Sequence, residues 1–180
     1  MALPSTVLKA KISISDLVRG YYADHQLTIA QHPSENEIRV LVRMIAFIHN
    51  ASERLQFGRG ISTDEDADIW EKNDHGGVDL WIELGLPEEK EIKKLSSKAE
   101  KVRIYAYSDP KIQAWMIKNR KLLSAWDNVE FFRIGDSEVE AAMPLMARNM
   151  DWSVIVQEEG EMTLSSVDHN VDVRIERLTA

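Results

Sequence analysis

The first thirty residues alternate apolar and polar positions, which is the pattern of a half-buried strand. Residues 7–15 show this alternation, and residues 21–30 form a second such segment after a short connection at residues 16–20. Successive side chains of a strand point to opposite faces, so each run predicts a strand with one buried face. The chain therefore opens with a predicted β-hairpin.

A long apolar helix is predicted next, from about Ser34 to Arg54. Ser34 and Glu37 have the S-x-x-E spacing of a capping box. Apolar residues follow at helical spacing and also fill much of the opposite side: Ile38, Leu41, Val42, Ile45 and Ile48, then Val40, Met44 and Phe47. A helix that is apolar nearly all round is a buried one. Arg39 and Arg43 are the main charges in its middle.

Beyond residue 64, predicted strands and helices alternate. A hairpin has arms at 67–73 and 78–85, and the next elements are helices at 88–101, 111–123 and 136–147, strands at 102–107 and 128–134, and three strands within 151–178. This order predicts an α/β protein with a mixed sheet flanked by helices. Both termini add strands, which we expect to form a second, antiparallel patch. We find no internal repeat or linker, so residues 1–180 are interpreted as one domain.

The hairpin at residues 67–85 shows the strongest chemical pattern. With His75-Gly76 as a two-residue turn, the strands pair Trp70 with Trp81, Lys72 with Asp79, and Asp68 with Glu83, all on one face. The first two pairs are favourable, whereas like charges directly opposite each other are destabilising unless a cation lies between them. We therefore expect buried Trp70 and Trp81 beside a cation site, and a main core that includes Ile38, Leu41, Ile45, Leu80, Ile82 and Leu84.

Two simpler interpretations of these carboxylates remain open. Six acidic residues lie between Asp64 and Asp74, and such a segment is often a solvated loop with an edge strand. Glu83 lies within the apolar run Leu80 to Leu84, and a buried carboxylate needs a partner. That partner is a metal ion, an arginine (Arg39 or Arg43) or another hydrogen-bond donor. In the second case Glu83→Gln should destabilise the protein, because a cation would be left unpaired.

Composition narrows the possible functions. The chain has no cysteine, which excludes disulfides, thiolate metal sites and a cysteine nucleophile. Its net charge of -8 disfavours broad, non-specific binding to nucleic acid. No apolar run approaches the roughly 18 residues of a membrane span, and no signal peptide is visible, so we expect a cytoplasmic protein.

Several motifs resemble those of one family of small bacterial proteins. They are His32-Pro33-Ser34-Glu35, Leu55-Gln56-Phe57-Gly58-Arg59-Gly60, Leu80-Trp81-Ile82-Glu83-Leu84-Gly85-Leu86-Pro87 and Ile92-Lys93-Lys94. In combination they resemble the YaeQ family across essentially the whole chain. That resemblance implies a compact fold built around a variant of the PD-(D/E)XK nuclease motif, and it implies no established activity.

The resemblance assigns provisional roles to five residues. Asp68 and Glu83 match the motif's two carboxylates, which would bind Mg²⁺ or Mn²⁺. Gly85 stands where the motif has lysine, and some relatives in the superfamily supply that lysine from the next helix. Lys94, with Lys93 in reserve, is therefore the candidate cation, although either lysine is also explained as a solvated side chain. Glu35 fits the additional glutamate of the first helix, but an acid in the first turn is also favoured by the helix dipole.

Two functions follow from this sequence. One is a metal-dependent phosphodiesterase or nuclease-like enzyme acting on nucleic acid. The other is a non-catalytic interaction or regulatory protein that binds a protein partner and retains the nuclease-like scaffold. The missing lysine and the acidic composition favour the second function, and the facing carboxylates favour the first. The sequence leaves the substrate and the oligomeric state open.

Overall fold

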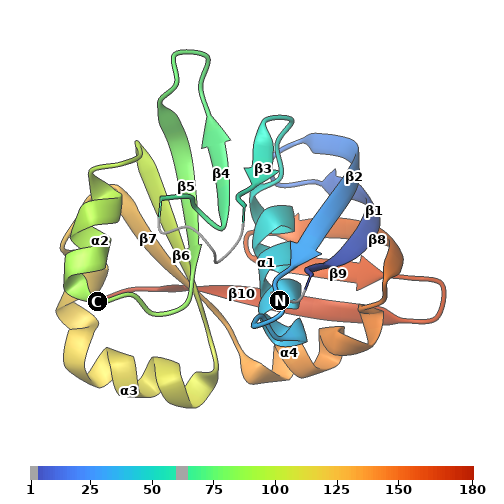
Figure 1. The fold of residues 1–180 in the computed structure, drawn as a ribbon. Coiled ribbons are helices and arrows are strands. Elements are labelled where there is room, and N and C mark those ends of the chain that lie inside the picture. Colours follow the sequence, from blue (N-terminus) through green and yellow to red (C-terminus); the bar gives the residue numbers. More distant parts are fainter. Residues whose placement is uncertain (1–3, 60–64) are drawn as a thin grey trace.

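The computed structural model describes residues 4–59 and 65–180, and these form a mixed α+β fold (Figure 1). The strands are β1 (Thr6–Asp16), β2 (Tyr21–Gln31), β3 (Leu55–Phe57), β4 (Ile69–Lys72), β5 (Val78–Leu84), β6 (Lys101–Tyr107), β7 (Val129–Ile134), β8 (Asn149–Glu158), β9 (Glu161–Ser165) and β10 (Asn170–Leu178). The α-helices are α1 (Glu37–Asn50), α2 (Glu89–Ser96), α3 (Asp109–Asn119) and α4 (Asp136–Ala142). The mixed sheet with flanking helices is as predicted.

The described strands form one continuous sheet, in the order β2-β1-β8-β9-β10-β7-β6-β5-β4-β3. Strand β10 joins its two halves, because its first part pairs with β9 and its last part pairs with β7. The terminal strands do form antiparallel pairs, as predicted, but they continue the main sheet instead of forming a second patch. Strand β1 also pairs with β8 in parallel, because the tail returns to the sheet beside β1 in the same direction. The sheet curves until it is nearly a barrel (Figure 1).

Helix α1 lies inside the curved sheet, as its apolar surface predicts. Ten of its residues are buried, and the ring of Phe47 contacts both edge strands. It stacks on Phe57 of β3 at 5.0 Å between centroids and meets His25 of β2 edge-on at 5.4 Å. Helix α1 thus fills the space between the two edges of the sheet.

The ends of α1 differ from the sequence prediction. Its N-cap is Asn36, whose side chain accepts a hydrogen bond from the Arg39 N–H, while the Ser34 hydroxyl bonds to His32. The capping box at Ser34 is therefore wrong, because a closer side chain already caps the helix. Ile38 is 40% exposed rather than in the core, since it lies in the first turn. The helix ends at Asn50, and the residues predicted as its last turn lead into β3.

Strands β5, β6 and β7 are parallel and are connected through α2 and α3. These helices cover the sheet face opposite α1 and form a second core with Trp81. Ile82 and Leu84 belong to the α1 core. The period of two along β5 therefore points Glu83 toward the same side as Trp81.

The hairpin of β4 and β5 confirms half of the predicted register. Trp70 pairs with Trp81, and their rings meet edge-on at 5.9 Å. Trp81 is 3% exposed, and Trp70 is half-buried. A bulge after Glu71 places Lys72 opposite Val78, so the predicted Lys72–Asp79 pair is wrong. The turn is also longer than two residues, because the Asn73 N–H donates to the Gly77 carbonyl and leaves residues 74–76 between them.

Within the described ranges, no helix is long and apolar enough to cross a membrane.

Gly58 brings β3 against the start of β4. A Cβ atom at this position would lie 1.8 Å from the backbone oxygen of Ala67, whereas a Cβ at Gly76 in the hairpin turn would meet nothing within 4 Å. We expect Gly58→Ala to lower the free energy of unfolding by about 3 kcal/mol or more, because backbone must move. Gly76→Ala should cost about 1 kcal/mol, because only its positive φ is strained. Urea unfolding of both variants measures this, and equal stabilities would contradict the close approach.

Candidate functional site

Asp68 and Glu83 lie at one end of the β4–β5 hairpin. Asp68 directly precedes β4, and the pairing of Ile69 with Ile82 continues toward it from the hairpin. Asp68 is 6% exposed. Its Oδ2 accepts the Leu84 N–H at 2.9 Å, and its backbone oxygen accepts the Gly58 N–H at 3.0 Å. Backbone N–H groups on both sides therefore fix this residue, and the one of Leu84 fixes its carboxylate.

Glu83 occupies a less polar environment than Asp68. Its Oε2 accepts a hydrogen bond from Trp81 Nε1 at 2.9 Å. Burial, together with the nearby charge of Asp68, raises the pKa of Glu83 from 4.5 to about 7, although the Trp81 bond and Arg39 oppose this shift. A carboxyl group with a pKa near neutral can both take and give a proton, as a general acid or base does.

Two arginines of α1 bind the other two acids at this site. Arg39 donates to Glu35 Oε1 at 2.9 Å and to Asp68 Oδ1 at 2.6 Å. Arg43, one turn further along α1, donates to Glu35 Oε2 at 3.1 Å and to the Ala30 carbonyl at 2.9 Å. The spacing of four residues places both guanidinium groups on one side of the helix.

The arginine interpretation of Glu83 is therefore wrong. Arg39 and Arg43 do pair with carboxylates, but their partners are Glu35 and Asp68. In the parts of the chain that the structure describes, no ion pair involves Glu83. The sequence placed both arginines on the helix correctly. The contact of Arg39 with Asp68, 29 positions further along the chain, cannot be inferred from helical spacing.

Glu35 precedes α1 rather than lying in its first turn. Its side chain is 1% exposed and bridges both arginines. The helix-dipole explanation for this residue is therefore unnecessary, because its position is explained by two buried ion pairs. The structure places Glu35 in the same network as Asp68, on the α1 side of the hairpin end.

Lys93 and Lys94 lie on α2, away from its buried residues Ile92 and Leu95. Both lysines are exposed. Across the described residues, neither lysine forms a hydrogen bond or an ion pair with Glu83, so their catalytic role stays a prediction. Sequence reasoning missed Lys98, whose Nζ lies 4.8 Å from the ring centroid of Trp81. Its position depends on how the end of α2 packs against β5, which no local pattern reports.

The carboxyl ends of β5 and β6 meet at this edge of the sheet. Tyr107 ends β6 and is half-buried. Burial raises the pKa of Tyr107, and the charges of Arg39 and Asp68 also act on it. Ser108 follows with a φ of 71°, a left-handed conformation that is uncommon for residues other than glycine. In open α/β sheets ligands bind at the carboxyl ends of the strands, and the carboxylates lie at this edge.

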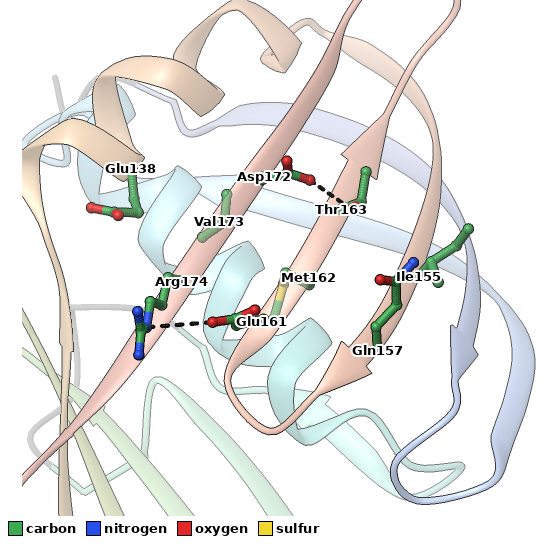
Figure 2. Close-up of a pocket in the computed structure, with 9 residues that line it drawn as sticks. All are labelled: Glu138, Ile155, Gln157, Glu161, Met162, Thr163, Asp172, Val173 and Arg174. Atoms are coloured by element: carbon green, nitrogen blue, oxygen red, sulfur yellow. Dashed lines mark hydrogen bonds and ion pairs between the residues drawn. The ribbon is translucent and has the colours of Figure 1, made fainter.

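A separate hollow of about 380 Å³ lies on the outer face of β8, β9 and β10 (Figure 2). Figure 2 shows that polar side chains there pair with each other: Thr163 donates to Asp172 at 2.7 Å, and Arg174 lies 3.6 Å from Glu161. These polar groups already satisfy one another. We therefore place the candidate site at Asp68 and Glu83 rather than in this hollow.

The raised pKa of Glu83 predicts a pH-dependent stability. The folded state holds the proton more tightly than the unfolded chain, so this contribution is complete below about pH 4.5 and is lost as the pH rises through 7. The shift corresponds to at most about 3 kcal/mol. Glu83→Gln removes the charge and keeps an acceptor for Trp81. We expect its melting temperature to exceed that of the wild type at pH 8 and to approach it at pH 5.

Thermal unfolding at both pH values measures this difference, with Glu100→Gln as the control because Glu100 is exposed. A Glu83→Gln variant that melts below the wild type at pH 8 would show that the charged form of Glu83 is stabilised by a cation.

Comparison with known proteins shows the same relationship by sequence and by structure. The model of the YaeQ protein family matches residues 1–175. The uncharacterized YaeQ proteins of Escherichia coli K12 and Salmonella typhi are each 36% identical over 175 residues, which cover 97% of this chain and 96% of theirs. The crystal structure of YaeQ from Xanthomonas axonopodis pv. citri has a TM-score of 0.92 at 35% identity, over 98% of this chain and 99% of that one. YaeQ from Pseudomonas syringae has a TM-score of 0.92 at 31% identity, over 99% and 98%.

The sequence motifs, the family match and the two solved structures agree over almost the full length, and this chain belongs to the YaeQ family.

Proposed function

We propose that this protein is a metal-dependent phosphodiester hydrolase, with Asp68 and Glu83 as its central carboxylates. The observation that carries the proposal is that Glu83 is half-buried beside a second carboxylate and, among the described residues, has no ion pair of its own. Such an arrangement is unfavourable in an apolar setting, and strongly perturbed acids cluster at functional sites. A divalent cation between the two groups would stabilise both in their charged forms.

The donor set suits Mg²⁺ or Mn²⁺. Within residues 4–59 and 65–180, no group of three His, Asp or Glu side chains is close enough to form a complete protein cage. Mg²⁺ is commonly bound by one or two carboxylates, while waters and substrate phosphates complete its shell. Asp68 and Glu83 would supply those carboxylates. When bound, the metal activates water and stabilises the charge on the phosphate.

The chain itself positions these groups. The Leu84 N–H and the Trp81 indole N–H orient one oxygen of Asp68 and one of Glu83, and Arg39 binds the other oxygen of Asp68. Each oxygen retains lone-pair capacity for a further interaction. Trp81 is buried, so it forms a wall beside Glu83 and is not a platform on which bases stack.

The second candidate function, a non-catalytic interaction protein, is favoured by one observation. Arg39 and Arg43 already neutralise Asp68 and Glu35 without a metal. A network that is balanced in this way can serve purely to attach α1 to the β4–β5 hairpin. The two functions differ in what the protein binds: nucleic acid for the hydrolase, and a protein for the interaction protein. The expected cytoplasmic location stays a prediction.

Metal binding tests the proposal directly. Binding to the folded state alone stabilises it by about 2.7 kcal/mol at a hundredfold excess over the dissociation constant. We expect millimolar Mn²⁺ to raise the melting temperature of the wild type at pH 8, and to have little effect on Asp68→Asn or Glu83→Gln relative to each variant's own metal-free value. Asp172→Asn, in the distant hollow of Figure 2, is the control. No shift in the wild type would rule out the metal site.

Catalysis is tested separately. The wild type should nick single-stranded DNA, duplex DNA or RNA in the presence of Mn²⁺, and Glu83→Ala should not. An identical background for the two proteins on all three substrates would favour the interaction protein, with the carboxylates retained for structure.

A further inference from the structure

Two arginines of α1, Arg39 and Arg43, belong to the charge network at the hairpin end, and their side chains differ in solvent exposure. The side chain of Arg43 is 2% exposed, whereas that of Arg39 is 17% exposed. Arg43 is bonded to Glu35 and to a backbone carbonyl in the interior. Arg39 therefore lies between the buried part of the network and the surface.

Glu35 does not require Arg39 for its charge balance, because Arg43 already neutralises it. Arg39 makes a further pair with Asp68 at 2.6 Å. A guanidinium group has five N–H donors in a planar fork, and Arg39 uses two of its nitrogens, Nη1 and Nη2, in these ion pairs. The group has further N–H donors, and its side chain is partly exposed, so a ligand could bind the donors that remain.

The charge of Arg39 also affects the net charge of the site. Glu35, Asp68 and Glu83 carry three negative charges when ionised, against two positive charges on Arg39 and Arg43. A divalent cation would change the total from one negative to one positive charge, which matches a phosphodiester anion. Without Arg39 the same metal-bound site would be neutral. Two further charged residues lie near Glu83. Glu91 raises its pKa, and Lys98 lies over the ring of Trp81; because their charges are opposite, they leave this total unchanged.

We propose that Arg39 is the residue that binds the phosphodiester group of the substrate, in the role that the sequence assigned to Lys94 or Lys93. This inference rests on the proposed function. The ion pair with Asp68 fixes the guanidinium group beside the carboxylates that would hold the metal. Arginine binds phosphate oxygens through two parallel hydrogen bonds, and positive charge there would stabilise the transition state.

The test uses a small probe with a single phosphodiester, the dinucleotide dTpdT. Its dissociation constant is measured by thermal shift at saturating Mn²⁺ and again without metal, and the Mn²⁺ dissociation constant is measured alone. The proteins are the wild type, Arg39→Gln, Arg39→Lys and Lys94→Gln. Arg54→Gln is the matched control, because Arg54 forms an exposed ion pair with Asp74.

We expect the wild type and Arg54→Gln to bind dTpdT only with Mn²⁺. Arg39→Gln should weaken that binding roughly tenfold or more, the usual range for a hydrogen bond to a charged group. Its affinity for Mn²⁺ should be unchanged or higher, because Asp68 loses a competing cation. Arg39→Lys retains the charge without the fork and should show a smaller loss. If Arg39→Gln does not fold, Arg39→Lys decides the question.

Three results would overturn this inference alone. The first is that Arg39→Gln, or Arg39→Lys if only that variant folds, binds dTpdT as tightly as the wild type. The second is that Lys94→Gln loses dTpdT binding while the Arg39 variants keep it, and the third is that the wild type binds Mn²⁺ but not dTpdT. A wild type that binds neither would overturn the proposed function, and this inference with it.

Discussion

The burial of helix α1 is the constraint on which the rest of the structure depends. A helix with ten buried residues in fourteen must be covered on nearly every side, and hydrophobic burial is the dominant favourable term in folding. The sheet meets this requirement by curving around the helix, and β10 makes the curvature possible by pairing with both halves. Phe47 then fills the space between edge strands β2 and β3. The nearly closed sheet is thus a consequence of one unusually apolar helix.

The same burial explains the charge network. Arg39 and Arg43 belong to α1, so enclosing the helix removes two guanidinium groups from most of their water. Such groups persist in an interior only when they are paired and hydrogen-bonded. Glu35 supplies a pair from the segment before the helix, and Asp68 supplies one from the start of β4. Helix α1 and the hairpin are therefore connected by ionic contacts as well as by apolar packing.

Glu83 differs from these acids because, among the described residues, it forms no ion pair. Its neighbours are Trp81 and the core formed with α2 and α3. The arginines of α1 are committed to other carboxylates, and burial raises the pKa of Glu83 to about 7. A protein selected only for stability would gain by replacing such a group with an apolar one. Its presence at the carboxyl ends of parallel strands is the physical basis for considering this edge a functional site.

The sequence by itself determined the order of the strands and helices apart from β3, the burial of α1 and the pairing of Trp70 with Trp81. These features depend on periodicity and on short chain reversals, so residues close together in the sequence determine them. Asp68 and Glu83 were candidates from their predicted pairing and Glu35 from the family resemblance, and their functional roles stay predictions. Only the tertiary structure decided which cation meets which acid, because Arg39 and Asp68 are 29 residues apart and meet only once the sheet has closed around the helix. The family resemblance, by contrast, assigned the missing cation to the lysines of α2. In the folded protein those lysines face solvent, and Arg39 of the buried helix lies at Asp68 instead. The packing of helix and sheet decides which side chain faces the site, and the spacing of residues along a single element does not.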